Sequence, residues 1–212
     1  MGRSPLKIKI CGLTREEDAV YAAALGAWAL GFIFYRKSPR YIEPAAVRGI
    51  LDTVAQCGGK PEKTVGVFVN ADAAEIEQVR KIAGINTVQI HGDETPEFFR
   101  DLPGEKWRAL RLAGEEDLKE ISLWQGASHI LVDAAVKGAY GGTGQVADWR
   151  LAAQAATKVP LLLSGGLTPE NLLDGIHQVR PVGVDVSSGV ESAPGIKSPQ
   201  LLKEFFSRLR EA

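Results

Sequence analysis

Short apolar runs recur along the whole chain, separated by roughly 20–35 residues, which leaves room for a crossover helix between each pair. Most of the runs are continuously hydrophobic rather than alternating, as is typical of strands covered on both faces. Eight runs have this character: Ile8–Ile10, Trp28–Ile33, Val65–Val69, Thr87–Ile90, Trp107–Leu112, His129–Val132, Leu161–Leu163 and Val182–Val186. The pattern predicts a parallel sheet of eight strands.

Helix-start signals lie between the apolar runs. Thr14 and Glu17 form a capping box, which predicts a helix over Arg15–Leu25 that ends before Gly26. Prolines after a cap residue, or a glycine at the end, predict further helices over Glu43–Val54 and Asp72–Ala83, and helices that begin at Thr95, Thr168 and Ser198. The segment Glu115–Leu123 predicts only one or two irregular turns.

Eight strand–helix units without a break in composition favour an α/β protein with a single (β/α)8 TIM barrel that spans residues 1–212. A doubly wound open sheet rarely needs eight units in a chain of this length. Two small domains would need a linker, and the one candidate is Gln56–Lys63. This segment falls inside a helix-to-strand connection, so the barrel is the preferred interpretation.

Composition narrows the classes of partner. The 212 residues carry a net charge of −1, with 45% hydrophobic and 24% charged residues, so no global field attracts nucleic acid or a membrane surface. The two cysteines, Cys11 and Cys57, give no disulfide framework and suit a reducing compartment. We find no signal peptide or long apolar segment and predict a cytoplasmic protein. The three histidines lack the spacing of metal ligands, so no metal is expected.

In a barrel of this type the active site lies at the carboxyl ends of the strands. Cys11 ends the first run and Asp133 follows the sixth, so both side chains are expected at the same mouth. A thiolate and a carboxylic acid across a small pocket can act as base and acid. The thiol pKa would have to fall from about 8.5 and the carboxyl pKa rise from about 3.9. The alternatives are an inert buried thiol and a carboxylate that caps a turn.

The loops after the last two runs have the composition of a phosphate site. Gly165 and Gly166 allow a ligand to approach the backbone closely. The last run then ends in a segment that supplies carboxylate, hydroxyl and glycine, through Asp185, Ser187, Ser188 and Gly189. Barrels often bind phosphate at these two loops, which predicts a small phosphorylated substrate. Simple tight turns are the alternative.

Three further features belong to the same predicted mouth. Arg40 lies in a basic loop with Arg36 and Lys37, where a guanidinium would suit a carboxylate. His91 ends the fourth run and is expected to touch the ligand. A glycine-rich segment after Asp133 is typical of a lid rather than a dinucleotide-binding loop, and its members Gly141, Gly142 and Gly144 are assigned to that lid.

Motifs along the whole chain resemble the phosphoribosylanthranilate isomerase family of tryptophan biosynthesis. The matching segments occur in order, and the last is the most specific: Lys9–Thr14, Gly31–Tyr35 with Ser38–Tyr41, Val65–Asn70, Val88–Gly92, Leu131–Ala134, Tyr140–Gly144, Leu163–Leu167 and Val184–Glu191. Three positions depart from the usual family pattern, at Arg36, Arg111 and Ala147. They leave Cys11 and Asp133 untouched.

The resemblance implies an Amadori rearrangement without a cofactor, on a small-molecule substrate. N-(5-phosphoribosyl)anthranilate would be converted to 1-(2-carboxyphenylamino)-1-deoxyribulose 5-phosphate. By this resemblance Cys11 would be the general base, Asp133 the general acid and Arg40 the partner of the anthranilate carboxylate. The resemblance leaves open whether the chain is a monomer or a homodimer.

Two alternatives stay open at this point. One is another phosphosugar isomerase or epimerase, although a ribulose-phosphate epimerase usually needs metal-binding histidines and an aminoimidazole-ribotide isomerase has an aspartate where Cys11 stands. The other is a barrel that binds a phosphosugar without turnover. The presence of both Cys11 and Asp133 argues against this second alternative.

Overall fold

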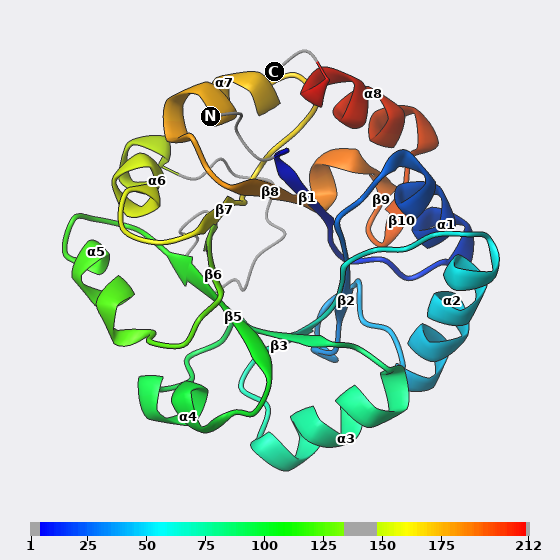
Figure 1. The fold of residues 1–212 in the computed structure, drawn as a ribbon, viewed down its shortest axis with the longest axis horizontal. Helices are drawn as coiled ribbons and strands as arrows, with labels where there is room; N and C mark the ends of the chain where they lie inside the picture. The colour runs from blue at the N-terminus through cyan, green and yellow to red at the C-terminus, as the bar shows by residue number, and fades with distance from the viewer. Residues whose placement is uncertain (1–4, 134–147, 211–212) are drawn as a thin grey trace.

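The computed structural model describes residues 5–133 and 148–210. Eight parallel strands close into a barrel in sequence order, with β1 paired to both β2 and β8 (Figure 1). The strands are β1 (Lys7–Ile10), β2 (Ala29–Ile33), β3 (Lys63–Phe68), β4 (Thr87–Ile90), β5 (Glu105–Arg111), β6 (His129–Asp133), β7 (Leu161–Leu163) and β8 (Gly183–Val186). The predicted barrel class is confirmed, and every predicted strand is present within two residues of its expected bounds.

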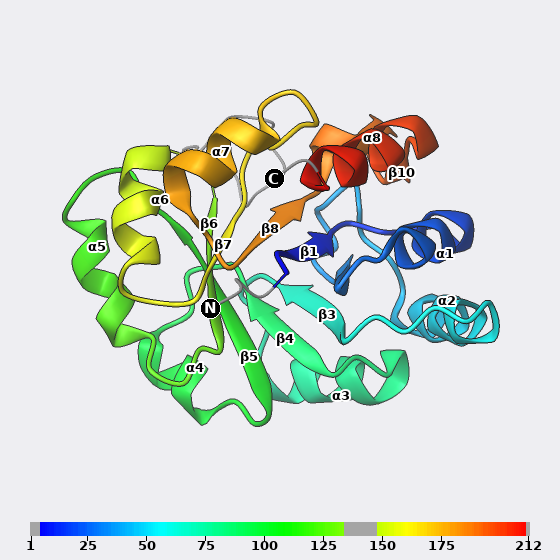
Figure 2. The same cartoon turned by 45° about the horizontal axis from the view of Figure 1, so that its top comes forward.

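Helices form a ring around the barrel (Figures 1 and 2). They are α1 (Glu16–Leu25), α2 (Pro44–Gln56), α3 (Ala73–Ala83), α4 (Pro96–Asp101), α5 (Asp117–Glu120), α6 (Trp149–Ala156), α7 (Leu172–Val179) and α8 (Pro199–Leu209), with short 3₁₀ turns η1 (Ile121–Leu123) and η2 (Ser188–Val190). Within residues 5–133 and 148–210, no helix has the length and apolar character needed to cross a membrane.

The barrel buries side chains on both faces of each strand. The outward-facing residues pack with the helices into one large core. The inward-facing residues form a smaller cluster, which contains Val65, Trp107, Leu131 and Leu162 and fills the interior toward the amino ends of the strands. Because successive strand residues point to opposite faces, the next inward positions along each strand reach the carboxyl end. Those positions carry the candidate site.

Helix-start signals predict most helix boundaries. Asp72, Thr95 and Ser198 each accept a hydrogen bond from a backbone N–H in the first turn of α3, α4 and α8. Gly26 and Gly84 end α1 and α3 in the left-handed conformation, as expected for glycine after a helix.

The starts of two predicted helices are wrong, although both helices are present, and one helix was missed. Thr14 does not cap α1, because its hydroxyl donates to the Gly195 carbonyl at 2.5 Å and the N-cap is Arg15. The helix predicted from Thr168 begins only at Leu172, because the Asn171 side chain first closes a turn with the Thr168 N–H. Helix α6 follows Asp148, whose carboxylate caps it, and the pattern of apolar runs did not identify it.

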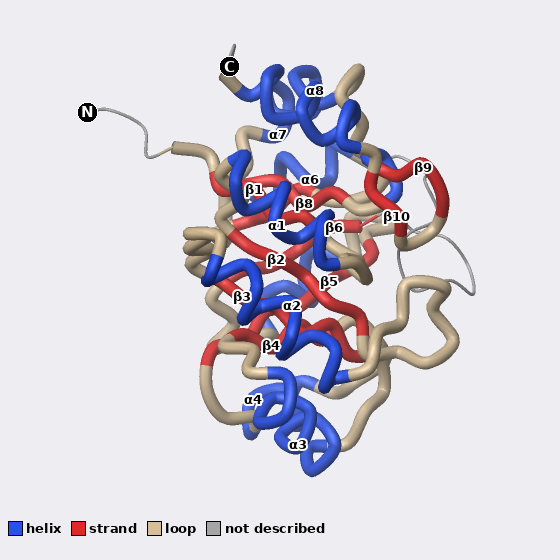
Figure 3. The backbone as a smooth tube through the Cα atoms, turned by 90° about the vertical axis from the view of Figure 1, so that its right-hand side faces the viewer, coloured by secondary structure: helices blue, strands red, loops and turns tan. Residues whose placement is uncertain are grey.

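A two-stranded hairpin follows the barrel. Strands β9 (Glu191–Ala193) and β10 (Ile196–Lys197) pair antiparallel directly after η2. Figure 3 shows the hairpin beside the barrel, on the side where the longer loops gather. The hairpin carries Glu191 and Lys197 toward the candidate site, and the sequence pattern did not predict it.

Candidate active site

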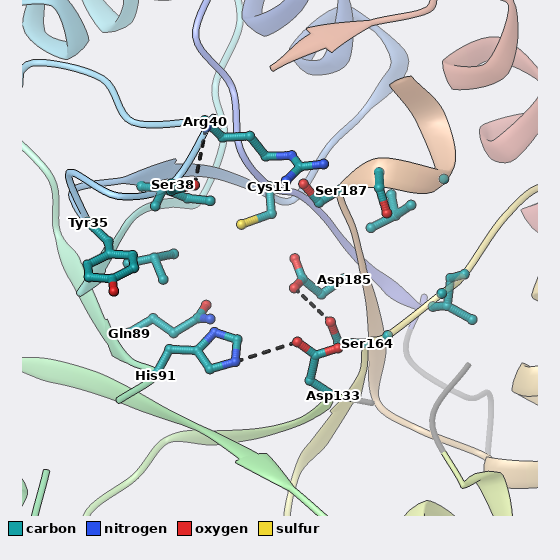
Figure 4. A pocket seen from close by; sticks show the side chains of 18 of the residues that line it. Cys11, Tyr35, Ser38, Arg40, Gln89, His91, Asp133, Ser164, Asp185 and Ser187 are labelled. Atoms are coloured by element: carbon teal, nitrogen blue, oxygen red, sulfur yellow. Dashed lines mark hydrogen bonds and ion pairs between the residues drawn. The ribbon is translucent and has the colours of Figure 1, made fainter. Parts of the chain in front are cut away.

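A pocket lies at the carboxyl ends of the barrel strands (Figure 4). All the described residues that were assigned to catalysis or substrate binding line it: Cys11, Arg40, His91, Asp133, Gly165, Gly166, Asp185, Ser187, Ser188 and Gly189. They come from loops or strand ends spread over the full chain, and only closure of the barrel brings them together. Gly141, Gly142 and Gly144, the predicted lid, lie outside the described residues.

Strand β1 delivers Cys11 to the pocket. Lys9 precedes it by two positions, so both side chains point into the barrel. Lys9 is fully buried, and its Nζ donates to Asp185 Oδ1 at 2.7 Å. Strands β1 and β8 are paired so that Lys9 and Asp185 lie directly opposite each other. The thiol therefore stands next to a buried ion pair.

The glycine at position 31 makes room for this arrangement. A Cβ at Gly31 would lie 3.0 Å from both the Cys11 Sγ and the Lys9 Cε. Strand β2 thus approaches the two side chains too closely for any other residue to fit without a shift. Asp185 is held from its other side as well, since Ser164 Oγ donates to its Oδ2 at 3.1 Å.

The charges around Cys11 act in opposite directions. Burial raises the pKa of the Cys11 thiol, and the Asp185 carboxylate adds to that effect. The ammonium groups of Lys9 and Lys197 lower the same pKa but do not outweigh burial. The sequence suggested that nearby cations would help to bring this pKa down. Two cations are present, yet the net shift in the ligand-free pocket is upward.

Asp133 faces His91 across the pocket. The shortest distance between them is 3.5 Å, from His91 Nε2 to Asp133 Oδ2, which is long for a hydrogen bond (Figure 4). Burial is the largest cause that lowers the pKa of His91, followed by the charges of Arg108, Lys9 and Arg111, and together they bring it to about 3. His91 is therefore neutral at neutral pH, and the contact is not an ion pair.

A second buried charge cluster holds the loop that carries His91. Arg108 donates to Glu94 at 3.0 Å and to the Gly92 carbonyl at 2.8 Å. Glu94 also accepts from the backbone N–H groups of Asn70 and Gly92. These bonds tie the ends of β3 and β4 together and fix where His91 enters the pocket.

Arg40 reaches the pocket from the loop after β2. Its Nε and Nη2 donate to the Glu191 carboxylate at 2.8–3.1 Å. Of the three basic residues predicted in this loop, Arg36 and Lys37 do not line the pocket. Arg36 instead pairs with Glu43 on the exposed surface at 3.2 Å.

The two glycine-containing loops adopt the conformations that their sequence predicts. Gly165 and Gly166 have φ values of 83° and 63°, in the left-handed region that favours glycine. A side chain at Gly189 would collide with the Leu167 carbonyl, so the loops after β7 and β8 pack directly on each other. Asn171 supports them by donating to the Gly166 carbonyl at 2.9 Å.

Some pocket residues were not assigned a role from sequence. Gln89 lines the pocket two positions before His91, and its Oε1 has no hydrogen-bond partner among the described residues. The alternation along β4 was a usable signal, because His91 and Gln89 share a face. Glu191 and Lys197 do not line the pocket but bond to Arg40 and to the Ser187 carbonyl, and they had no such signal, since their hairpin was not predicted.

A closed (β/α)8 barrel with a polar pocket at the carboxyl ends of its strands is the architecture of TIM-barrel enzymes. Comparisons with known proteins narrow this class. The model of the family "N-(5'-phosphoribosyl)anthranilate (PRA) isomerase" matches residues 8–208. The N-(5'-phosphoribosyl)anthranilate isomerase of Magnetococcus marinus is 43% identical over 98% of this chain and 96% of its own length.

Solved structures of similar fold belong to the same family as the sequence relatives. Monomers generated from the dimeric phosphoribosylanthranilate isomerase of Thermotoga maritima superpose with a TM-score of 0.85 at 36% identity, covering 98% of this chain and 100% of that one. A phosphoribosylanthranilate isomerase in complex with reduced 1-(o-carboxyphenylamino)-1-deoxyribulose 5-phosphate has the same TM-score at 35% identity and the same coverage. The chain belongs to the N-(5'-phosphoribosyl)anthranilate isomerase family and is an enzyme of that family.

Proposed function

We propose that this enzyme converts N-(5'-phosphoribosyl)anthranilate to 1-(2-carboxyphenylamino)-1-deoxyribulose 5-phosphate in tryptophan biosynthesis. The observation that carries the proposal is that Cys11 and Asp133 line one pocket together with the glycine loops after β7 and β8. The family match and the relative that binds a reduced form of this product support the substrate.

In the proposed reaction Asp133 acts as general acid and Cys11 as general base. Asp133 gives a proton to the ring oxygen, the C1′–O bond breaks, and the anthranilate nitrogen supplies the electron pair that forms an iminium ion. The Cys11 thiolate then takes the proton from C2′, which leaves an enolamine that tautomerises to the ketone. Substrate and product are isomers, so no oxidant or cofactor enters the balance.

Lys9 has a clear place in this scheme. Because burial raises the pKa of Cys11, the substrate-free pocket favours the thiol. A thiolate must therefore be stabilised when it forms, and the Lys9 ammonium is the buried cation beside it. Lys9 keeps its proton, since Asp185 and Cys11 raise its pKa more than burial lowers it.

The pocket offers separate groups for the two anionic ends of the substrate. We assign the phosphate to the loops of Gly165, Gly166 and Ser187–Gly189, where backbone can approach it closely. We assign the anthranilate carboxylate to Arg40, and His91 and Asp185 to the wall of the pocket.

The direct test is turnover of freshly made phosphoribosylanthranilate, followed by the loss of its fluorescence. The wild-type protein should consume it. Cys11→Ser and Asp133→Asn should each lower kcat by about 10²–10⁴, the range that general acid–base catalysis contributes. Both substitutions preserve side-chain size, so the melting temperature should change little. Wild-type kcat in either variant would remove that residue from the mechanism.

Arg40→Ala tests the assignment of the carboxylate. The substitution should raise KM more than it lowers kcat, because Arg40 binds a part of the substrate that does not react. Arg36→Ala is the matched control, since Arg36 lies in the same loop but pairs with Glu43 on the surface. A change in kcat alone for Arg40→Ala would contradict the binding role.

A further inference from the structure

The side chain of Arg40 is not held by its own loop alone. Its guanidinium forms a side-on pair with Glu191, with Nε at 2.9 Å from Oε1 and Nη2 at 2.8 Å from Oε2. Both partners are buried, with 9% and 4% of their side chains exposed. No described residue accepts a hydrogen bond from Arg40 Nη1. The pair therefore fixes the plane of the guanidinium and leaves one amino group for another acceptor.

Glu191 is shared with a second cation. Lys197 Nζ donates to Glu191 Oε1 at 2.7 Å, and the Lys197 side chain is fully buried. Glu191 stays ionised at neutral pH: burial raises its pKa, but Arg40 and Lys197 together lower it below its usual value. The Glu191 carboxylate thus bonds to the Arg40 guanidinium on one side and to Lys197, whose pKa burial lowers, on the other.

The same lysine reaches the phosphate loop. Lys197 Nζ also donates to the Ser187 carbonyl at 3.1 Å. Ser187 lines the pocket, and its buried hydroxyl has no hydrogen-bond partner among the described residues. Lys197 therefore holds the backbone of Ser187 from behind while the Ser187 hydroxyl keeps its bonding capacity.

Arg40 and Ser187 both lie against Gly12, the residue after Cys11. A Cβ at Gly12 would lie 2.7 Å from the Arg40 Cδ and 2.9 Å from the Ser187 Oγ. Arg40 and Ser187 therefore pack over the same point of the chain. The hairpin that supplies Lys197 is itself anchored, since the Lys197 N–H donates to the buried carboxylate of Asp18 on α1 at 2.9 Å.

We propose that Glu191 and Lys197 are positioning residues that join Arg40 to the Ser187 loop, so that one buried cluster sets the spacing between the carboxylate end and the phosphate end of the pocket. This inference rests on the proposed function. Glu191 acts through Arg40, and Lys197 acts through Glu191 and the Ser187 carbonyl. Neither touches the reacting atoms.

The first experiment measures whether Glu191 acts through Arg40. Glu191→Gln keeps the size of the side chain and removes its charge. It should raise KM for phosphoribosylanthranilate by about tenfold to a hundredfold, the cost of a displaced binding group, with a smaller change in kcat. In an Arg40→Ala background the same substitution should change KM less than twofold. A KM equal to that of the wild type, or an equal increase with and without Arg40, would overturn the proposal.

The second experiment measures the phosphate end with inorganic phosphate as a competitive inhibitor. Lys197→Met should raise the inhibition constant of phosphate about tenfold, because the Ser187 loop loses its support. Arg36→Ala, an exposed residue of the Arg40 loop that pairs with Glu43, should leave this constant unchanged. An unchanged constant in Lys197→Met would show that Lys197 only pins the hairpin, which would overturn its positioning role.

Two controls separate positioning from folding. Glu204→Gln removes an exposed carboxylate on α8 and should alter neither KM nor phosphate inhibition. If Glu191→Gln does not fold, Glu191→Asp keeps the charge but is too short to bridge Arg40 and Lys197, and it should also raise KM. A wild-type KM in Glu191→Asp would overturn the proposal. Failure of the proposed function would appear differently, as no turnover by the wild-type protein.

Discussion

The two ends of the barrel interior contain similar residues in different surroundings. Lys7 and Lys9 are neighbours on the inward face of β1, and each contacts a polar side chain from another strand. At the carboxyl end, Lys9 is bonded to the Asp185 carboxylate at 2.7 Å. At the amino end, Lys7 Nζ lies 3.0 Å from His129 Nε2 and 4.7 Å from the centre of the Trp28 ring. One lysine has a counter-charge, and the other has neutral aromatic partners.

The aromatic side chains close the amino end. Trp28 and Trp107 stack with ring centres 5.3 Å apart and an angle of 7° between their planes. His129 packs against both rings at 5.1–5.4 Å. Trp107 is completely buried. This end of the barrel is filled by packing, whereas the other end is a polar pocket.

The comparison shows that a buried histidine or lysine does not by itself mark a site. Burial, aided by neighbouring cations, lowers the pKa of His91 to about 3 and that of His129 to about 4. The two histidines respond alike, yet only His91 faces a carboxylate across a pocket. What distinguishes the ends is therefore the set of partners: an acid, a thiol and an ion pair at one end, and stacked indoles at the other.

Removing the two lysines should produce very different effects. Lys9→Met leaves the Asp185 carboxylate buried without its cation, which costs about 3–5 kcal/mol of unfolding free energy. Lys7→Met removes a partly exposed cation from neutral partners, so the cost should stay below about 1 kcal/mol. Chemical denaturation at pH 7 measures both values. Equal losses for the two variants would contradict the distinction between the two ends of the barrel.

The alkylation rate of Cys11 provides a second test of the difference between Lys9 and Lys7. Lys9 lowers the pKa of Cys11, so Lys9→Met should raise that pKa and slow alkylation of Cys11 by iodoacetamide at pH 8. Lys7→Met should leave the alkylation rate unchanged. A Cys57→Ser background removes the exposed second thiol from the measurement.

Trp107→Leu tests whether the amino end of the barrel contributes to stability through packing and not to catalysis. Truncation of a buried tryptophan to alanine costs about 3–5 kcal/mol, and leucine should recover part of this, for a loss of about 2–3 kcal/mol. The kcat per folded molecule should stay near that of the wild type, because Trp107 does not line the pocket. A loss of kcat without a loss of stability would show that the aromatic end takes part in the chemistry.

Sequence patterns predicted the fold well because each barrel strand is a local signal. Continuous apolar runs and cap residues such as Asp72 act within a few residues of the element they define. The clearest error occurred where a side chain that could cap a nearby helix bonds instead to a residue far away in the sequence. Thr14 resembles a cap, but its hydroxyl bonds to Gly195, which lies 181 positions away. No local pattern reports such a contact.

The residues of the site also divide into those that the sequence predicts and those that it does not. Residues at strand ends, such as Cys11 and Asp133, follow from the barrel once its strands are known. Glu191 and Lys197 depend on a short hairpin with little apolar content, so their position was not predictable. The net rise in the Cys11 pKa was also hidden, because it depends on burial and on the spacing of charges across β1 and β8.

The last comparison concerns the two histidines and pH. Both have folded-state pKa values below the ordinary value of 6.5, at about 3 for His91 and about 4 for His129. As pH falls through about 6.5, the unfolded chain takes up as many as one proton on each of these histidines while the folded protein does not, so the free energy of unfolding falls with pH and is retained above that range. Between pH 6.5 and 5 each histidine should contribute a slope that approaches about 1.4 kcal/mol per pH unit. Urea denaturation across this range should show that His91→Asn and His129→Asn each remove one contribution from the slope. An unchanged slope in His129→Asn would mean that the aromatic end lets His129 take up its proton in the folded state, and that the two ends differ in burial as well as in partners.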